Sequence, residues 1–259
     1  MKKTLIALTV AASAAVSGSA MAWTANGSGG LVEVGGTLTP VEKVTPWEVA
    51  TGAAVTNADA QVQKAQSLVE VNVAQSIPVL AIRSTATDGF VGQAGISPQI
   101  DMPWLAGHNW NSANSAINGT VNVLDDASAK IGEAMFSLQA VAVAGGMSLD
   151  SGKTYQRLMF ADAAGTAYYG GLLTSAPDSD IRNIITAAWP DLDSKFIFSS
   201  ASWVTKATES FDAANWKFSS YYGSVIPVNS KINITLDTPV TGDAPIKWKI
   251  NLPVGVTYQ

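Results

Sequence analysis

The chain has 259 residues, no cysteine and one histidine; charged side chains make up only 14%, with a net charge of −5. The absence of cysteine excludes disulfides, thiolate nucleophiles and Cys metal sites, and the mildly acidic chain has no basic run of the kind that binds nucleic acid. Hydrophobic residues make up 47%, so the chain can bury a sizeable core and hide further surface against copies of itself.

The amino-terminal residues predict export. A positive start at Lys2-Lys3 precedes the uncharged apolar run Leu5–Val16, and Ala20-Met21-Ala22 has the small-x-small pattern that signal peptidase recognises. A transmembrane anchor is the alternative, but the run is shorter than the roughly 20 apolar residues that a spanning helix needs. We therefore expect residues 1–22 to be a signal peptide.

The rest of the chain shows repeated strand signals. Alternating or continuous apolar residues predict strands at Val32–Leu38, Ser67–Ala74, Ile77–Ile82, Val121–Val123, Met135–Ala144 and Ile232–Leu236. The long apolar run among them, Met135–Ala144, is expected to be buried on both faces. Short strands separated by Gly, Pro, Asn and Asp predict an all-β sandwich.

One helix interrupts this pattern. Ser179–Trp189 has apolar residues at helical spacing, with Asp178 or Ser179 available as a cap and Pro190 after the end. We interpret residues 145–222, approximately, as an insertion in the sandwich that contains this helix.

The carboxy-terminal segment Ile246–Tyr258 has the strongest strand pattern. Every second residue is large and apolar, which specifies one register; they are Ile246, Trp248, Ile250, Leu252, Val254, Val256 and Tyr258. Pro253 cannot donate a ladder hydrogen bond, so an edge strand is favoured over a central one.

The amino-terminal extension, residues 23–39, also ends in an alternating segment. It begins with a glycine- and serine-rich leader, and Val32, Val34, Gly36 and Leu38 then fall on one face. Such a segment could fill a groove beside a neighbour's edge strand, as happens in strand addition. Head-to-tail contacts of this kind build filaments. The alternative is a monomeric sandwich whose first and last strands pair within the chain.

Three segments resemble the kappa-class chaperone–usher pilins, the adhesive major subunits of thin, flexible enterotoxigenic fimbriae. They are the extension from Trp23 through Val32–Thr39, the insertion segment Phe160-Ala161-Asp162 with Tyr169-Gly170-Gly171-Leu172, and the ending Trp248–Tyr258. The absence of cysteine is shared with that class.

The resemblance implies an incomplete immunoglobulin-like sandwich, residues 40–259, completed by a donor strand. It implies a periplasmic chaperone and an outer-membrane usher as partners, and a final location in a fimbria on the cell surface. Val32, Val34, Gly36 and Leu38 would form the donor strand. The edge strand and main chaperone contact would be formed by Trp248, Ile250, Leu252, Val254, Val256 and Tyr258.

The resemblance also implies that the subunit binds host glycans through its insertion. Sugar recognition needs aromatic faces and polar side chains, and candidate residues are Tyr155, Phe160, Asp162 and Tyr169. Phe160 and Tyr169 could instead be core residues of the insertion. Another possible site comprises Trp104, His108 and Trp110.

The residue inventory disfavours an enzyme. His108 is the only histidine, so a multi-His metal site is impossible and a Ser-His-Asp triad would depend on this one residue. Ser151-Gly152-Lys153-Thr154 lacks the correctly spaced first glycine of a P-loop. The acidic pairs Asp125-Asp126 and Asp191–Asp193 are expected in solvated turns, and we expect no metal or cofactor.

Two other functions remain compatible with the sequence. One is a monomeric exported sandwich that binds or hydrolyses carbohydrate. The other is a minor subunit of the same fimbria, because major and minor subunits use the same two ends.

Overall fold

The computed structural model describes residues 25–27, 32–39 and 44–259, and it divides the chain into two units, Met1–Lys43 and Val44–Gln259. The predicted signal peptide, residues 1–22, lies outside the described residues. In the first unit, residues 32–39 form no strand. The strand predicted at Val32–Leu38 is therefore wrong for this chain alone, since a strand needs a hydrogen-bonded neighbour.

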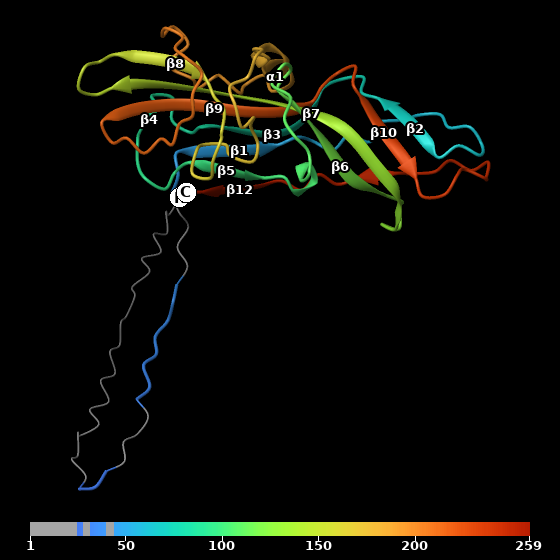
Figure 1. Cartoon of the computed structure of the whole chain (residues 1–259), viewed down its shortest axis with the longest axis horizontal. Coiled ribbons are helices and arrows are strands. Elements are labelled where there is room, and N and C mark those ends of the chain that lie inside the picture. Colours follow the sequence, from blue (N-terminus) through green and yellow to red (C-terminus); the bar gives the residue numbers. More distant parts are fainter. Residues whose placement is uncertain (1–24, 28–31, 40–43) are drawn as a thin grey trace, which may run out of the picture. The chain divides into compact units, whose positions relative to one another are not determined.

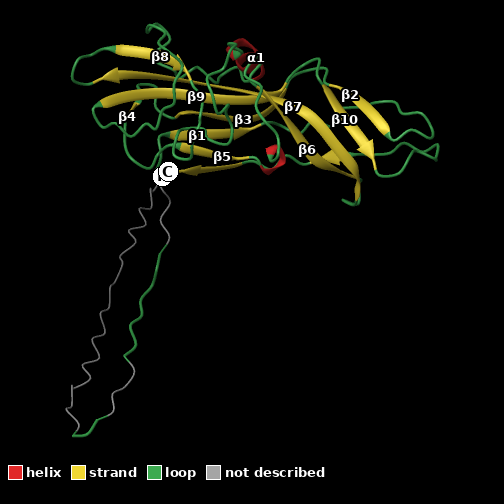
Figure 2. Ribbon diagram, in the orientation of Figure 1, coloured by secondary structure: helices red, strands yellow, loops and turns green. Residues whose placement is uncertain are grey.

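The second unit is built on one large antiparallel sheet (Figures 1 and 2). Its main path runs in the order β1-β3-β9-β7-β10-β2. The bounds are β1 Trp47–Thr51, β3 Ile77–Ser84, β9 Trp216–Ile226, β7 Lys130–Ser148, β10 Lys231–Leu236 and β2 Leu68–Asn72. These strands include four of the predicted segments, and the all-β class is confirmed.

Further strands extend the sheet and form a second layer. β4 (Phe90–Val91) pairs with β9, β8 (Thr154–Leu158) pairs with β7, and β6 (Ala116–Leu124) connects β7 to β11 (Lys249–Ile250). A separate two-stranded sheet joins β5 (Pro98–Asp101) to β12 (Gly255–Tyr258). In Figure 1, β5 and β12 lie below β1 and β3, and the chain folds as a β-sandwich.

The burial of side chains changes along β7, the longest strand of the described residues. Its first half alternates, with Met135 44% exposed beside the buried Ala134 and Phe136. From Leu138 to Gly146 every residue is buried, because the even-numbered residues 138–144 face one hydrophobic cluster while Val141 and Val143 face another. Burial on both faces is therefore confirmed for the later part of the predicted run but not for its beginning.

The expected insertion begins and ends inside the β7–β9 ladder, which extends from the pair Gln139–Val225 to the pair Ser148–Trp216. The chain between these strands forms β8, a series of turns and α1 (Arg182–Ala188). The helix is confirmed, but its expected cap is wrong. Its first residue follows Ile181, which supplies no side-chain cap, and Asp180 instead accepts from the backbone N–H of Arg182 at 3.1 Å.

The carboxy-terminal segment is broken into β11 and β12 instead of forming one strand. Residues 251–254 between them have no ladder partner. Pro253 has no N–H to donate, which explains why the ladder stops there. None of the helices among the described residues has the length and apolar character needed to cross a membrane.

Candidate functional site

The apolar face of the carboxy-terminal segment is only half covered. Its inward side chains pack against the core but none is fully buried; they are Trp248, Ile250, Leu252, Val254, Val256 and Tyr258. Ile246, at the start of this face, is 46% exposed. The alternate side chains Lys247, Lys249, Asn251 and Thr257 point to solvent. The predicted alternation is present, but this face has no complete cover.

A groove of about 1000 Å³ lies beside this segment. One wall is residues 245–254, and the other is formed by the chain that follows β1, Thr51 to Asp59. Its floor comes from three strands of the main sheet and consists of Ile77, Pro78 and Val79 of β3, Ile226 of β9 and Ile232 of β10. Most of the lining is therefore apolar, and its charged members are Asp59, Asp126, Lys247 and Lys249.

The carboxy-terminal segment also has an unpaired backbone edge. Gln259 and Ser97 exchange both backbone hydrogen bonds, at 2.9 and 3.1 Å, so the odd-numbered residues at this end face β5. Antiparallel alternation then turns the N–H and C=O groups of Val256 and Tyr258 toward the opposite edge. In the described part of the chain, no strand pairs with that edge.

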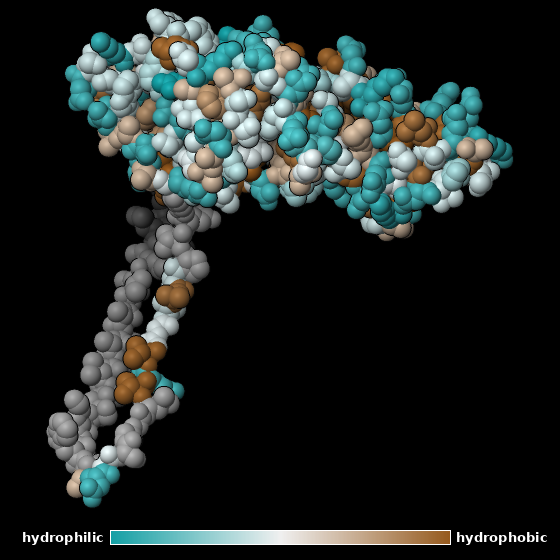
Figure 3. Space-filling model, in the orientation of Figure 1, coloured by the Kyte–Doolittle hydropathy of each residue, from teal (hydrophilic) through white to brown (hydrophobic). Residues whose placement is uncertain are grey.

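The large predicted donor residues are among the most exposed apolar side chains of the described chain. Val32, Val34 and Leu38 are 83%, 95% and 97% exposed, and the described part of the first unit carries brown, hydrophobic residues in Figure 3. A Cβ atom added to Gly36 would meet nothing within 4 Å. The apolar face is therefore free to be buried by another surface.

The predicted glycan-binding residues differ in accessibility. Tyr155 is 8% exposed; its hydroxyl donates to Glu209 Oε2 at 2.7 Å, and the Arg157 guanidinium lies 4.1 Å from its ring centroid. Burial, together with the Glu209 carboxylate, raises the pKa of Tyr155 far above its usual range. Phe160 is half-buried. The Tyr155 ring is therefore largely covered, whereas Phe160 keeps part of its surface exposed.

The other two residues of this set, Asp162 and Tyr169, are exposed. Tyr169 lies in a turn held against β5, where its carbonyl accepts from Ile100 N at 2.8 Å. Gly170 follows with a φ of +87°, a conformation that favours glycine. The neighbouring Tyr168 points into the core, is fully buried and stacks on Tyr222. This turn therefore presents one aromatic side chain to solvent from a fixed backbone.

The alternative aromatic site does not present an exposed indole at Trp104, which is 5% exposed. Its Nε1 donates to the carbonyl of Pro253 at 2.9 Å. His108 Nε2 lies 3.0 Å from the hydroxyl of Thr120, and Trp110 packs partly buried against the core. Trp104 thus contacts the carboxy-terminal segment, and no sequence pattern predicted this contact.

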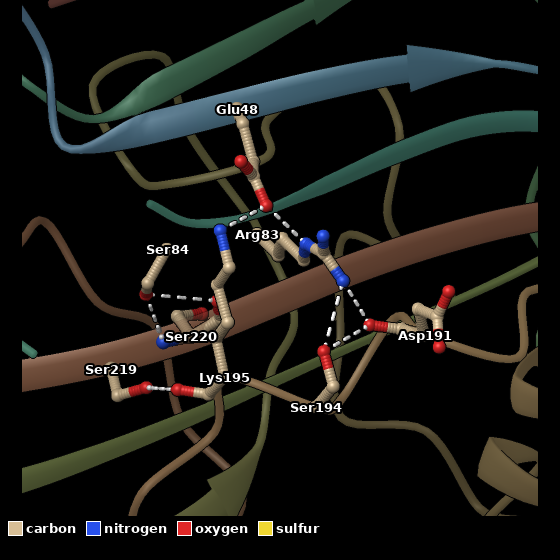
Figure 4. Close-up of polar contacts among 8 residues, drawn as sticks. All are labelled: Glu48, Arg83, Ser84, Asp191, Ser194, Lys195, Ser219 and Ser220. Atoms are coloured by element: carbon tan, nitrogen blue, oxygen red, sulfur yellow. Dashed lines mark hydrogen bonds and ion pairs between the residues drawn. The ribbon is translucent and has the colours of Figure 1, made fainter. Parts of the chain in front are cut away.

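Figure 4 shows a polar cluster that sequence patterns did not reveal. Glu48 of β1 accepts from Lys195 Nζ at 2.7 Å and from Arg83 Nε of β3. Arg83 also donates to the carbonyl of Asp191 and, at 3.0 Å, to Ser194 Oγ. The hydrogen bond from Lys195 is the main factor that lowers the pKa of Glu48. The cluster ties residues 191–195 to the first strand of the sandwich.

The acidic pairs show no catalytic arrangement. Asp125 closes a turn, with Oδ1 accepting from Ala129 N at 2.8 Å, and Asp191 contributes its backbone carbonyl to the cluster above. Among residues 25–27, 32–39 and 44–259, no group of three or more His, Asp or Glu side chains could hold a metal ion.

One family comparison decides the identity. The family described as "Fimbrial, major and minor subunit", of the K88 type, matches residues 1–259. The chain belongs to this fimbrial subunit family. The resemblance predicted from both ends and the insertion is thereby confirmed. A search of curated proteins found no significant match.

Membership defines the general role. The fimbrial subunit is a structural component of a surface fimbria, and members of this structural family assemble into filaments with other subunits. A model of assembly must account for two features of this subunit, the groove and the exposed amino-terminal segment.

Proposed function

We propose that this fimbrial subunit polymerises by donor-strand exchange, in which Val32–Leu38 of one copy fills the groove of the next. The observation that carries the proposal is the groove of about 1000 Å³ beside a carboxy-terminal segment whose apolar face is half-buried. A sandwich that supplied all of its own strands would cover that face. An added strand covers apolar side chains and pairs with unpaired backbone groups at the same time.

The two surfaces match in length and pattern. At about 3.3 Å per residue, Val32–Leu38 extends roughly 20 Å and Ile246–Val254 roughly 26 Å. The donor segment therefore fits within the wall of the groove. Its three large side chains alternate with Glu33 and Thr37, so one face can enter the groove while the polar residues stay outside.

Before assembly, the same groove is a hazard. An open apolar edge recruits other chains and aggregates. We therefore propose a periplasmic chaperone that lends a strand to the groove, and an outer-membrane usher at which the donor segment of another subunit replaces it.

The direct test is deletion of residues 30–38 in cells that carry the chaperone, the usher and the other subunits. The deletion removes the donor segment but leaves the groove, so the chaperone complex is expected to form and polymers to be lost. Electron microscopy with an antibody to the subunit gives the readout. The matched control, Glu33→Ala with Thr37→Ala, changes only the polar face and is expected to assemble. Normal fimbriae after the deletion contradict the proposal.

A second function, adhesion to host glycans, is favoured by the turn at Tyr169. Tyr169 is 38% exposed on a backbone held by β5, and Asp162, seven residues earlier in the chain, is also exposed. We expect Tyr169→Ala to weaken attachment of assembled fimbriae to host cells, while Ala164→Ser on the same segment leaves it unchanged. Unchanged attachment by Tyr169→Ala places adhesion elsewhere.

A further inference from the structure

The break in the carboxy-terminal segment has one point of attachment. β11 pairs with β6 at Lys249 and Ile250, and β12 pairs with β5 from Gly255 to Tyr258. Among the described residues, a single hydrogen bond reaches residues 251–254, from Trp104 Nε1 to the Pro253 carbonyl at 2.9 Å. At the centre of the groove wall the backbone therefore has one hydrogen-bond partner, while the side chains of Leu252 and Val254 pack against the core.

That indole is itself held firmly. Trp104 lies in the 3₁₀ helix η1 (Pro103–Leu105), and its ring packs against Phe136 with centroids 5.4 Å apart. Gly119 of β6 makes the room, because a Cβ there would lie 2.5 Å from Trp104 Cε3. The hydrogen-bonded pair His108–Thr120 ties the chain after η1 to the same strand.

The bond also fixes the direction of the backbone. Odd-numbered residues of β12 face β5, and the carbonyl of Pro253 lies on this same side, where Trp104 takes the place of a strand partner. Alternation then presents the backbone groups of Leu252 and Val254 to the open edge. If Trp104 did not hold the Pro253 carbonyl, the incoming strand would have to order residues 251–254, which have no ladder bonds of their own.

We propose that Trp104 is a positioning residue for strand addition, which holds the break at Pro253 in the geometry that an incoming strand requires. This inference rests on donor-strand exchange as the proposed function. Ordering a residue costs about 1–2 kcal/mol, and a surface already ordered before binding avoids that cost. A cavity of about 480 Å³ borders Trp104, Asn251 and Pro253, so the backbone there is incompletely packed, although the side chains of Leu252 and Val254 contact the core.

The test uses Trp104→Phe, which keeps an aromatic ring and removes the N–H donor. The chain 23–259 without residues 30–38, so that no copy can donate to another, is refolded with and without the substitution, and a labelled peptide of residues 30–40 is titrated by fluorescence anisotropy. One lost hydrogen bond predicts peptide binding weakened about three- to tenfold. Thr257→Ala, on the solvent side of β12, is the control and is expected to bind as the unchanged chain does.

A second readout separates positioning from plain stabilisation. In a chain with residues 30–40 fused after Gln259 through a flexible linker, the groove is filled and the added strand orders the break. Trp104→Phe is then expected to shift the unfolding midpoint by less than about 2 °C. The inference is overturned if the chain with Trp104→Phe binds the peptide as tightly as the chain with Trp104. It is also overturned if Trp104→Phe lowers the unfolding midpoint of the fused chain by more than about 2 °C. No binding by the unchanged chain overturns donor-strand exchange itself, and the inference with it.

Discussion

The donor segment permits a quantitative test at Leu38. Its side chain is 97% exposed in the free chain, so filling the groove would bury nearly all of it. Leu38→Ala removes three carbon groups, each contributing about 0.8 kcal/mol on burial. The expected loss is about 2.4 kcal/mol, or a roughly 50-fold weaker binding of the peptide 30–40 to the groove.

The assay is competition between unlabelled and labelled peptides for the refolded chain 23–259 without residues 30–38. Val34→Ala removes two carbon groups, so it is expected to weaken binding by about 1.6 kcal/mol, roughly 15-fold. Glu33→Ala, on the opposite face of the segment, is the matched control and should bind as tightly as the unchanged peptide. The reasoning is refuted if Leu38→Ala binds without loss, or if Glu33→Ala is weakened to the same extent.

Three further predictions concern the groove and the sheet edge. Val254→Asp places an unpaired charge on the half-buried face and should abolish recovery of the chaperone complex, whereas Thr257→Asp on the outer face should not; equal yields would argue against the edge role. A Cβ at Gly36 meets nothing in the free chain, so Gly36→Ala should leave the chaperone complex unchanged. The same substitution should slow polymerisation if Gly36 passes a tight point of the groove, and normal polymerisation would exclude a tight fit at this position. Glu48→Gln should lower the free energy of unfolding by about 1 kcal/mol. The loss is small because the side chains of Glu48, Arg83 and Lys195 are partly exposed to solvent. The pKa of Glu48 is lowered below 4.5, so this difference should persist at neutral pH and disappear as pH falls below that value; a difference that is independent of pH would show that the ion pairs do not cause it.

The two ends of the chain illustrate what local sequence can predict. Side chains alternate across a strand with period two, so the apolar face from Trp248 to Tyr258 and the exposed face from Val32 to Leu38 could be found without a structure. The same pattern does not say where a strand stops. Pro253 indicated an edge, but the division into β11 and β12 depends on which neighbours, β6 and β5, reach each part.

The aromatic residues show the same limit more sharply. Tyr168 and Tyr169 are adjacent and chemically identical, yet one is buried against Tyr222 and the other is 38% exposed. Tyr155 belongs to the core and Phe160 is half-buried. Composition identified residue types suited to a sugar, but only the turn beside β5 decides which ring reaches solvent.

The sequence by itself determined the fold class, the alternating apolar face of the carboxy-terminal segment and the family, because each depends on residues close together in the chain or on a pattern spread over its whole length. The tertiary structure decided the groove. Its walls are residues 51–59 and 245–254, and its floor comes from β3, β9 and β10. Trp104, 149 residues before Pro253, holds one of these walls. Such a surface has no sequence signature, because it exists only when distant segments, each unremarkable alone, pack around a space that none of them fills.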